Sequence, residues 1–542
     1  MAEQRTLRIA ILCKSITLPR WQAQSIRHLL EVPGVELVAV GTPRSERPWV
    51  SAVGLKAYVE KRCLALLIRK ANIMEELSDP LGLVPGVELP ANGHFGDRAL
   101  WSAYDPDILV SFLPPTESAG NRSGSLYPMW EFRFGEQAIG TNGLLGMRSM
   151  FTRERSLIAR LIPNDGSKAI AAEFPLRTED GEATLDLALA GAGWLPAKLA
   201  TTLVTDGVQD IGSTFSKAAI KPDAEDNMIG SLRSLFTLEM QRMNSQERQG
   251  PTHGEWNLGI LHQPISSLLD EDASTNVRWL PAPSGGNHRM EPFGYTAPDG
   301  QLNVLYRKKH RNNPIDEIAR LRPKSDSVLK RSRSMLTTSA SLHYPFVVER
   351  PDGAFAVISY PHQDKTELFK VAGTNDSLDH IKTLMNKALS SPTLIQFEDR
   401  WWMTGTDPDS PDSVLLAFYS QTMDGPFIPH PLNPLKIDSV GTRPAGTPFL
   451  HGTELWRPAL DTSDPSTVAI ILNRVDTLTT TAFHETAGRR LTGFRGTLYS
   501  NGIRTVSAMG DITLIDGLRG ITQEKQQGKT KEGKKRSKKR SS

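Results

Sequence analysis

A short unit of strand, two-residue turn and strand recurs along the second half of this sequence, and it restricts the possible folds more than any other feature. In one copy, the apolar residues 448–450 and 455–456 flank the turn His451-Gly452. The other copies are 291–293 with Asp299-Gly300 and 302–306, 344–348 with Asp352-Gly353 and 355–358, 392–395 with Glu398-Asp399 and 401–403, and a weaker 496–499 with Asn501-Gly502. The copies lie about fifty residues apart, which is the period of a β-propeller blade. Five copies predict a five-bladed β-propeller.

The first part of the sequence has a different pattern, so we expect more than one domain in the 542 residues. Apolar runs at 7–13, 35–41 and 108–113 alternate with helical patterns at 18–31 and 55–77. This order predicts an open parallel α/β sheet covered on both faces. We therefore place an α/β domain at 1–200, a helical bridge and linker at 201–252, the propeller at 253–520 and a disordered basic tail at 521–542.

Two features bear on the compartment. The only cysteines, Cys13 and Cys63, are too few for a disulfide framework or a four-ligand metal site. No apolar run is long enough for a signal-peptide core or a membrane span. We expect a soluble cytoplasmic protein without a transmembrane segment.

The basic character of the chain is concentrated at its end. Residues 521–542 hold nine Lys or Arg and two Glu, so a formal charge of +3 for the whole chain leaves about −4 on the body. The body therefore gives no reason to expect a nucleic-acid groove. The tail is too polar to fold alone. It either aids solubility and contacts anionic partners loosely, or serves a specific RNA, membrane-surface or targeting role.

The N-terminal part carries no GxGxxG after its first strand, so a dinucleotide site is not predicted. It contains, in order, the βαβ pattern, DPDILV at 105–110, WEFRFGE at 130–136, ARLI at 159–162, DGS at 165–167 and FP at 174–175. This order resembles the formyltransferase fold over about residues 5–200. The family includes methionyl-tRNA and sugar N-formyltransferases, which use 10-formyltetrahydrofolate. The resemblance implies one-carbon or acyl transfer to an amino sugar, with Glu131, Arg133 and Asp165 at the catalytic positions.

The catalytic segment departs from that family, whose members have Asn-x-His where this chain has Glu131-Phe132-Arg133. Their histidine acts as a general base. Arginine keeps its proton up to about pH 12, and a carboxylate at Glu131 would repel a developing oxyanion. Two hypotheses follow: an altered active site, or a degenerate scaffold in which Arg133 is solvated or pairs with Glu136 and Asp165-Gly166 forms a turn. We favour the degenerate scaffold.

The propeller part resembles a second family. It contains HYPF at 343–346, RPAG at 443–446, WRPA at 456–459 and FHE at 483–485. These motifs are similar to the amino-terminal region of glucosamine inositolphosphorylceramide transferases, and related bacterial proteins join such a region to a formyltransferase-like domain. That region is in turn similar to the five-bladed propellers of family 43 glycoside hydrolases. The resemblance implies a sugar or nucleotide-sugar ligand.

Family 43 hydrolases place carboxylates at the beginning of the inner strand of successive blades. The corresponding residues here are Glu291, Tyr344 and Ser391, so one carboxylate of three remains. Hydrolysis by that mechanism is therefore not expected.

We predict a saccharide site at the centre of the ring, because Arg, His, carboxylate and aromatic side chains recognise hydroxyls, phosphates and sugar rings. The candidate residues are Glu291, His343, His362, Asn433, Arg443, Trp456, Arg457 and Asp461. The alternative for each is structural, with Trp456 packing a blade and the arginines pairing between blades. The histidines are too scattered to predict a metal site.

Three functions stay open. The first is a transferase-like protein of sugar or glycoconjugate metabolism with a carbohydrate-binding propeller. The second is a catalytically degenerate carbohydrate-binding or scaffold protein. In the third, the basic tail delivers the folded body to RNA or an anionic surface.

Overall fold

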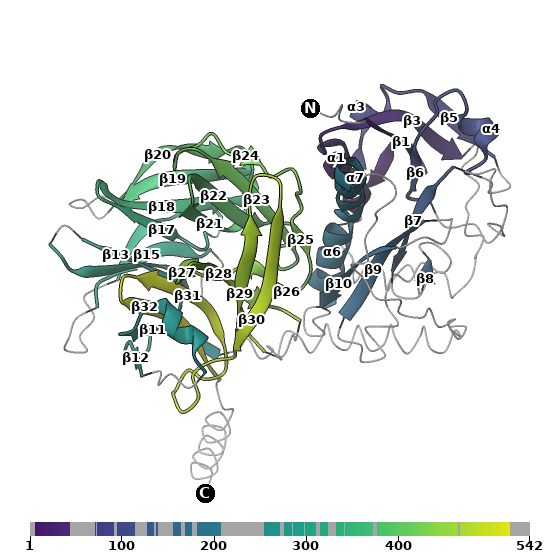
Figure 1. The fold of residues 1–542 in the computed structure, drawn as a ribbon. Coiled ribbons are helices and arrows are strands. Elements are labelled where there is room, and N and C mark those ends of the chain that lie inside the picture. The colour runs from purple at the N-terminus through teal and green to yellow at the C-terminus, as the bar shows by residue number, and fades with distance from the viewer. Residues whose placement is uncertain are drawn as a thin grey trace, which may run out of the picture.

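The computed structural model gives the placement of most of the chain. It describes residues 6–43, 71, 73–90, 95–113, 127–134, 137–138, 156–163, 169–175, 181–206, 254–271, 276–283, 286–297, 299–310, 315–323, 332–340, 342–371, 377–463 and 467–520. The described residues form an N-terminal α/β part and a C-terminal β part, which lie side by side (Figure 1).

The N-terminal part is built on a sheet with the strand order β10-β9-β7-β6-β1-β3-β5, and β8 pairs with β7. Its strands are β1 (Leu7–Leu12), β3 (Val35–Pro43), β5 (Gly86–Leu89), β6 (Ile108–Ser111), β7 (Met129–Phe134), β8 (Gln137–Ala138), β9 (Ser156–Pro163) and β10 (Ile170–Pro175). The strands from β5 to β7 are parallel, whereas β9 and β10 are antiparallel. The parallel sheet expected from the apolar runs is therefore present.

Three helices pack together on one side of this sheet: α1 (Arg20–Leu30), α6 (Gly181–Ala192) and α7 (Leu195–Asp206). Their apolar faces join Ile9 and Ile11 of β1 in one core. A second cluster around Trp101 of the short helix α4 (Arg98–Trp101) covers the other side, whereas Leu81 of the short helix α3 (Ser78–Leu81) belongs to the first core. Among the described residues, only the stretch Leu185–Thr205 is long and apolar enough to cross a membrane, and 72% of its most apolar window is buried within the protein.

The formyltransferase fold expected for this part is not supported, since the helices described around the sheet are few. The helix predicted at 55–77 falls mostly outside the described residues. Its end is wrong, because Met74–Glu76 forms the strand β4, which pairs with β2 (Thr17–Pro19).

The C-terminal part consists, in the residues described, of five sheets that we number as blades 1 to 5. Blade 1 contains β11 (Gly254–Leu261), β12 (Val277–Trp279), β31 (Ile503–Met509) and β32 (Ile512–Gly520). Blade 2 contains β13 (His288–Thr296), β14 (Leu302–Lys309), β15 (Glu317–Leu321) and β16 (Arg333–Leu336). Blade 3 contains β17 (Phe346–Arg350), β18 (Gly353–Tyr360), β19 (Lys365–Val371) and β20 (Leu378–Met385).

The last two blades have five strands each. Blade 4 contains β21 (Ser390–Phe397), β22 (Arg400–Thr406), β23 (Val414–Ser420), β24 (Ile428–Pro429) and β25 (Lys436–Ile437). Blade 5 contains β26 (Val440–Pro444), β27 (Phe449–His451), β28 (Glu454–Asp461), β29 (Ala469–Leu478) and β30 (Phe483–Leu491). Two short 3-10 helices, η1 (Ile265–Leu269) and η3 (Pro361–Gln363), lie in connecting segments.

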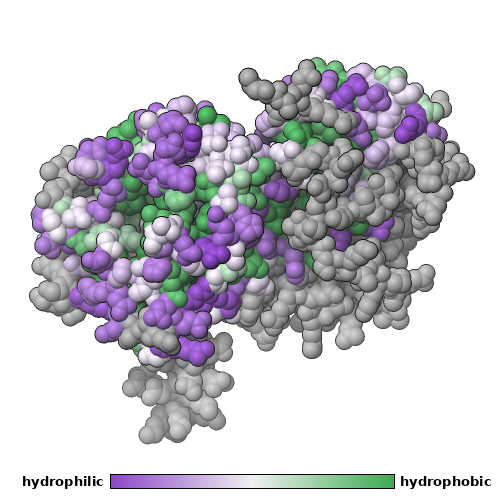
Figure 2. Space-filling model, in the orientation of Figure 1, coloured by the Kyte–Doolittle hydropathy of each residue, from purple (hydrophilic) through white to green (hydrophobic). Residues whose placement is uncertain are grey.

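The blades form a closed ring, which confirms the predicted five-bladed propeller (Figure 1). Inner strands of successive blades contact one another, from β31 through β13, β17, β21 and β26, and blade 5 returns to β31. The ring closes because β11, the first strand, pairs with β32, the last, from Gly254↔Gly520 to Leu261↔Thr513. Hydrophilic residues cover much of the outer surface of the propeller, with hydrophobic residues between and beneath them (Figure 2).

Four of the five predicted repeat units coincide with strand pairs of blades 2 to 5. The fifth is wrong, since residues 496–499 form turns and the inner strand of blade 1 begins at Ile503. Blade 1 differs because the two ends of the propeller contribute strands to it, so its sequence is not one continuous repeat.

The two parts meet where α6 and α7 face blade 4. Trp194 donates its indole N–H to Asp407 Oδ2 (3.2 Å), and Lys198 Nζ donates to the carbonyl of Pro434 (2.9 Å). The His28 ring stacks on the indole of Trp194, with 3.7 Å between the ring centroids. Burial raises the pKa of the Asp407 carboxyl to about 6. These contacts fix the N-terminal part to one side of the ring.

Gly446 lies at a close backbone contact between blades 5 and 1. It has φ +143° and bridges to Val506 of blade 1, and a Cβ at this position would lie 1.6 Å from the Val506 carbonyl oxygen. We predict that Gly446→Ala lowers the free energy of unfolding by about 3 kcal/mol, since a side chain there forces two blades apart. Urea denaturation followed by fluorescence measures this loss.

The matched control is Gly452→Ala, because Gly452 also has a positive φ (+61°) but no atom within 4 Å of the added Cβ. This substitution should cost only about 1 kcal/mol from backbone strain. Equal losses for the two variants would contradict a tight contact between blades 5 and 1.

Candidate functional site

Each blade contributes one side chain from the same region of its inner strand. In blades 2, 3 and 4 these residues are Glu291, Tyr344 and Ser391, which have φ angles of +55°, +52° and +54°. A positive φ is uncommon for residues other than glycine, so its repetition marks one local conformation used three times. Blades 5 and 1 contribute Arg443 and Arg504 from stretches where the strand register is also irregular. We call these five residues, together with His343 and Arg307, the axis site.

Glu291 is the buried carboxylate of the axis site, with a side chain only 2% exposed. Its Oε2 accepts the backbone N–H of Tyr344 (2.7 Å), and its Oε1 lies 3.4 Å from both Arg307 Nη1 and Arg504 Nε. Burial opposes ionisation, but the arginines, led by Arg307 and Arg504, outweigh it and lower the pKa of Glu291 to about 2. The group is therefore ionised under all ordinary conditions.

Arg443 reaches the same place from blade 5. Its Nε donates to Ser391 Oγ (3.0 Å) and its Nη1 lies 3.4 Å from Asp412 Oδ1. Burial lowers the pKa of its guanidinium, and the charge of Arg504 lowers it further. Two guanidinium groups thus lie close enough to repel each other.

His343 is held neutral at the axis site. Burial lowers its pKa to about 3, with Arg307 acting in the same direction and Glu291 opposing. Its Nδ1 is buried and has no hydrogen-bond partner among the described residues. A buried, unpaired imidazole nitrogen is costly unless a ligand completes it.

Tyr344 spans the axis of the ring. From blade 3 its hydroxyl accepts the N–H of Gly446 in blade 5 (2.7 Å), so the side chain crosses the centre of the ring between blades that are not neighbours. Its ring packs against Phe293 and Phe346, and burial raises the pKa of its hydroxyl. The axis therefore combines these charged groups with an aromatic cluster around Tyr344.

Asp516 of β32 fixes the backbone at the junction of blades 1 and 2. Its Oδ2 accepts the N–H of Glu291 (2.9 Å), and its Oδ1 accepts the N–H groups of Arg504 (3.0 Å) and Thr505 (2.7 Å). These are N–H groups that the irregular strands leave outside the regular ladder. Burial raises the pKa of Asp516 to about 6. Asp516 thus positions two members of the axis site.

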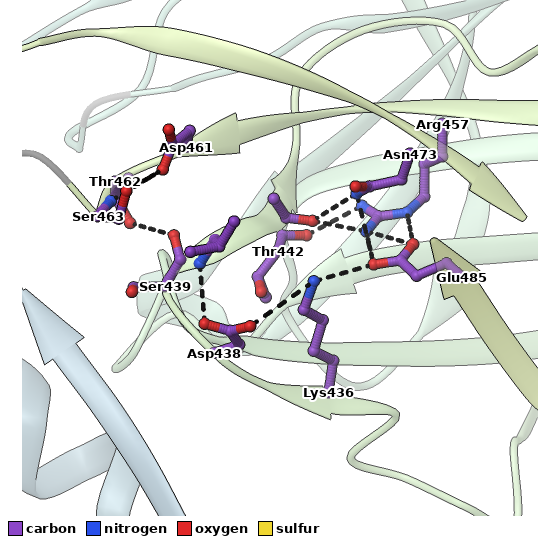
Figure 3. Close-up of polar contacts among 12 residues, drawn as sticks. Lys436, Asp438, Ser439, Thr442, Arg457, Asp461, Thr462, Ser463, Asn473 and Glu485 are labelled. Carbon is purple, nitrogen blue, oxygen red and sulfur yellow. Dashed lines mark hydrogen bonds and ion pairs between the residues drawn. The ribbon is translucent and has the colours of Figure 1, made fainter. Parts of the chain in front are cut away.

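The structure brings Glu291, His343 and Arg443 together, but other predicted site residues lie elsewhere. Arg457 is on β28, one strand further out, and its Nη2 lies 2.8 Å from both carboxylate oxygens of Glu485 (Figure 3). It also donates to the carbonyls of Gly441 and Thr442 (2.8 and 3.0 Å). Its role is therefore to hold β26, β28 and β30 together.

Four further candidates make local contacts outside the axis site. Asp461 pairs with Arg490 Nε at 2.5 Å, and Asn433 exchanges two hydrogen bonds with the backbone of Ala417 (2.9 and 2.8 Å). Trp456 packs against the core shared by blades 5 and 1, and His362 is exposed on η3. Their residue types fit sugar binding, but these contacts are made with residues outside the axis site.

Glu131 and Arg133, expected at a formyltransferase-like site, are both on β7. Burial raises the pKa of Glu131, whereas the charge of Arg133 opposes this shift. Arg133 Nε is buried without a hydrogen-bond partner in the described part of the chain. Asp165 lies outside the described residues, as does Glu136, the predicted partner of Arg133.

Sequence reasoning missed Arg307, Arg504 and Asp516. Arg307 follows the apolar run 302–306 on the middle strand of blade 2, and a repeat alignment gives it no special place. Arg504 could have been found, because it follows Ile503 at the blade 1 position equivalent to Glu291. The misplaced fifth repeat unit concealed that equivalence.

Comparison with known proteins relates the propeller to one family. Residues 282–496 match the profile described as glucosamine inositolphosphorylceramide transferase 1, N-terminal. Two curated relatives with the name glucosamine inositolphosphorylceramide transferase 1, from the japonica and indica subspecies of Oryza sativa, are each 25% identical over 150 residues, which is 27% of this chain and 20% of the relative. The chain thus covers about a fifth of those relatives. The predicted resemblance of the propeller to this family is confirmed.

Solved structures with some similarity are glycoside hydrolases. A family 117 enzyme from Zobellia galactanivorans has a TM-score of 0.32 and 11% identity, covering 49% of this chain and 91% of that one. A galactose complex of exo-β-1,3-galactanase from Phanerochaete chrysosporium has a TM-score of 0.30 and 10% identity, covering 38% and 51%.

Removing the charge of Glu291 tests the electrostatics of the axis site. We predict that Glu291→Gln lowers the free energy of unfolding by about 3–5 kcal/mol at pH 7, because it leaves buried guanidinium groups uncompensated. The pKa of Glu291 is lowered in the folded state, so its contribution is complete above the unfolded pKa of about 4.3 and is lost as the pH falls toward 2. Urea denaturation of both proteins between pH 7 and pH 3 should show the difference shrinking below pH 4.

The control is Glu398→Gln, at an exposed glutamate that also has a positive φ (+53°). It should change stability by less than about 0.5 kcal/mol at every pH. A loss at Glu291 no larger than this, or one independent of pH, would mean that the carboxylate does not hold the arginines.

Proposed function

We propose that this chain is a transferase-like protein of sugar or glycoconjugate metabolism whose propeller binds a saccharide at the axis site. The observation that carries the proposal is the convergence of charged and polar side chains around Tyr344 at the axis. These side chains are Glu291, His343, Arg443 and Arg504. The family match supports it, because residues 282–496 include every one of these residues except Arg504. The curated relatives have the name glucosamine inositolphosphorylceramide transferase 1.

The chemistry of the axis site favours binding over hydrolysis. A glycosidase needs one protonated carboxyl group to act on the leaving oxygen. Glu291 has a pKa of about 2 and cannot supply that proton at neutral pH, and Ser391 is engaged by Arg443. Guanidinium and imidazole N–H groups, by contrast, are well suited to bind hydroxyl oxygens. Carbohydrate binding without turnover in the propeller is the alternative that this composition favours, and any transfer reaction belongs elsewhere in the protein.

Formyl transfer from 10-formyltetrahydrofolate stays a prediction for the N-terminal part, and the residues described there do not fit it. Glu131, as a buried carboxyl of raised pKa, would either repel an oxyanion or be neutral. Arg133 cannot accept a proton at neutral pH. We therefore derive no catalytic step from this part of the chain.

Saccharide binding is tested by thermal unfolding of the full chain against a panel of monosaccharides, disaccharides and nucleotide sugars. A ligand present at a hundred times its Kd stabilises the native state by about 2.7 kcal/mol, so we predict that Tm rises by several degrees for at least one class. Arg443→Gln should abolish that rise. Arg495→Gln, at an exposed arginine that precedes β31, should keep it.

Two results would contradict the proposal: no shift with any member of the panel, or the same shift in Arg443→Gln as in the parent protein.

The folate prediction has its own test. Adding 5-formyltetrahydrofolate, a stable analogue of the donor, to the parent protein and to Glu131→Gln should give no shift in Tm in either, because the donor set does not fit. A rise in the parent protein that Glu131→Gln removes would restore formyl transfer as a function of the N-terminal part.

A further inference from the structure

The axis site holds more hydrogen-bond donors than the protein uses. Arg504 donates through Nε to Glu291, and Arg443 donates through Nε and Nη1 to Ser391 and Asp412. Both terminal nitrogens of Arg504 and Nη2 of Arg443 make no hydrogen bond or ion pair with any described residue. The side chains of Arg504 and Arg443 are 26% and 13% exposed, respectively, so both are partly accessible to solvent.

The charges at this place are also unevenly paired. Arg307 is satisfied by Asp316, which accepts from its Nε at 2.7 Å and also contacts its Nη2. Among the carboxylates of the described residues, Arg504 pairs with Glu291 at 3.4 Å and Arg443 pairs with Asp412 at 3.4 Å. Charge-assisted hydrogen bonds are normally about 2.7–2.9 Å long. Arg443 and Arg504 are therefore less closely paired with carboxylates than Arg307 is.

An anion between Arg443 and Arg504 would relieve this repulsion and use the free donors. The flat fork of a guanidinium matches the oxygens of a phosphate or carboxylate in two-point contacts. The neighbouring His343 Nδ1, which is buried and has no partner among the described residues, offers one more polar contact to the same ligand. Glu291 is buried and contacts Arg307 and Arg504, so it helps to position Arg504.

We propose that the saccharide bound at the axis site carries an anionic substituent, a phosphate or a carboxylate, which is held between Arg443 and Arg504. This inference rests on the proposed function, because it names the class of saccharide for the same site. Neutral sugars bind there through hydroxyl contacts alone. The anionic group supplies the larger share of the affinity and sets the orientation of the sugar.

The test is isothermal titration of the full chain with four probes: glucose, glucose 6-phosphate, glucuronate and inorganic phosphate. We expect inorganic phosphate to bind, and at least one of the two anionic sugars to bind ten times or more tightly than glucose. Comparison of glucose 6-phosphate with glucuronate separates phosphate from carboxylate as the preferred group. Arg504→Gln should weaken the anionic probes at least ten times more than it weakens glucose, whereas Arg495→Gln changes none of them.

Arg504→Lys keeps the charge but lacks the two-point geometry of the guanidinium, so its loss of affinity for the anionic probes should be intermediate. It replaces Arg504→Gln in the test if near-UV circular dichroism shows that Arg504→Gln does not fold. Equal affinity for glucose and the anionic sugars, or anion binding unaffected at Arg504, overturns this inference. If neutral saccharides still bind in an Arg443-dependent way, the proposed function survives that failure. If phosphate alone binds at the arginine pair and no saccharide does, the proposed function fails instead.

Discussion

Pairing between the first and last strands of the propeller is the interaction on which the site depends. β11 and β32 are joined along eight residue pairs, which bring the two ends of a chain segment of more than 250 residues into one blade. Asp516 lies on β32 within that pairing, and its carboxylate accepts backbone N–H groups from Glu291 of blade 2 and Arg504 of blade 1. The same strand pairing therefore closes the ring and positions two residues of the site.

The axis site uses one local backbone conformation to present side chains of different chemistry. Three equivalent positions share nearly the same positive φ, yet they hold Glu291, Tyr344 and Ser391. Only the first is acidic, and its neighbours keep it ionised. Tyr344 crosses the axis, while Arg443 and Arg504 add guanidinium nitrogens that no described residue uses. A catalytic centre with several carboxylates would repel the ligands that this one is arranged to attract.

The sequence predicts local features of this structure better than those that depend on closure. Alternating apolar residues and turn pairs identify blades 2 to 5. The comparison of equivalent positions in the sequence also identifies Glu291 as a candidate site residue. Blade 1 is missed because its strands come from opposite ends of the propeller. Arg457 and Asp461 have the right chemistry for a sugar site, but the register of β28 directs them to Glu485 and Arg490. Strand register is set by packing across the sheet, which a single sequence does not reveal.

The central claim is that an anion binds on the propeller axis between Arg443 and Arg504. Crystals of the full chain soaked in sodium selenate, and measured at the selenium absorption edge, locate the bound anion directly through its anomalous signal. The account predicts the strongest peak within hydrogen-bond distance of Nη2 of Arg443 and a terminal nitrogen of Arg504. Anomalous peaks found only at other basic residues, with the axis empty at full soaking concentration, would contradict it.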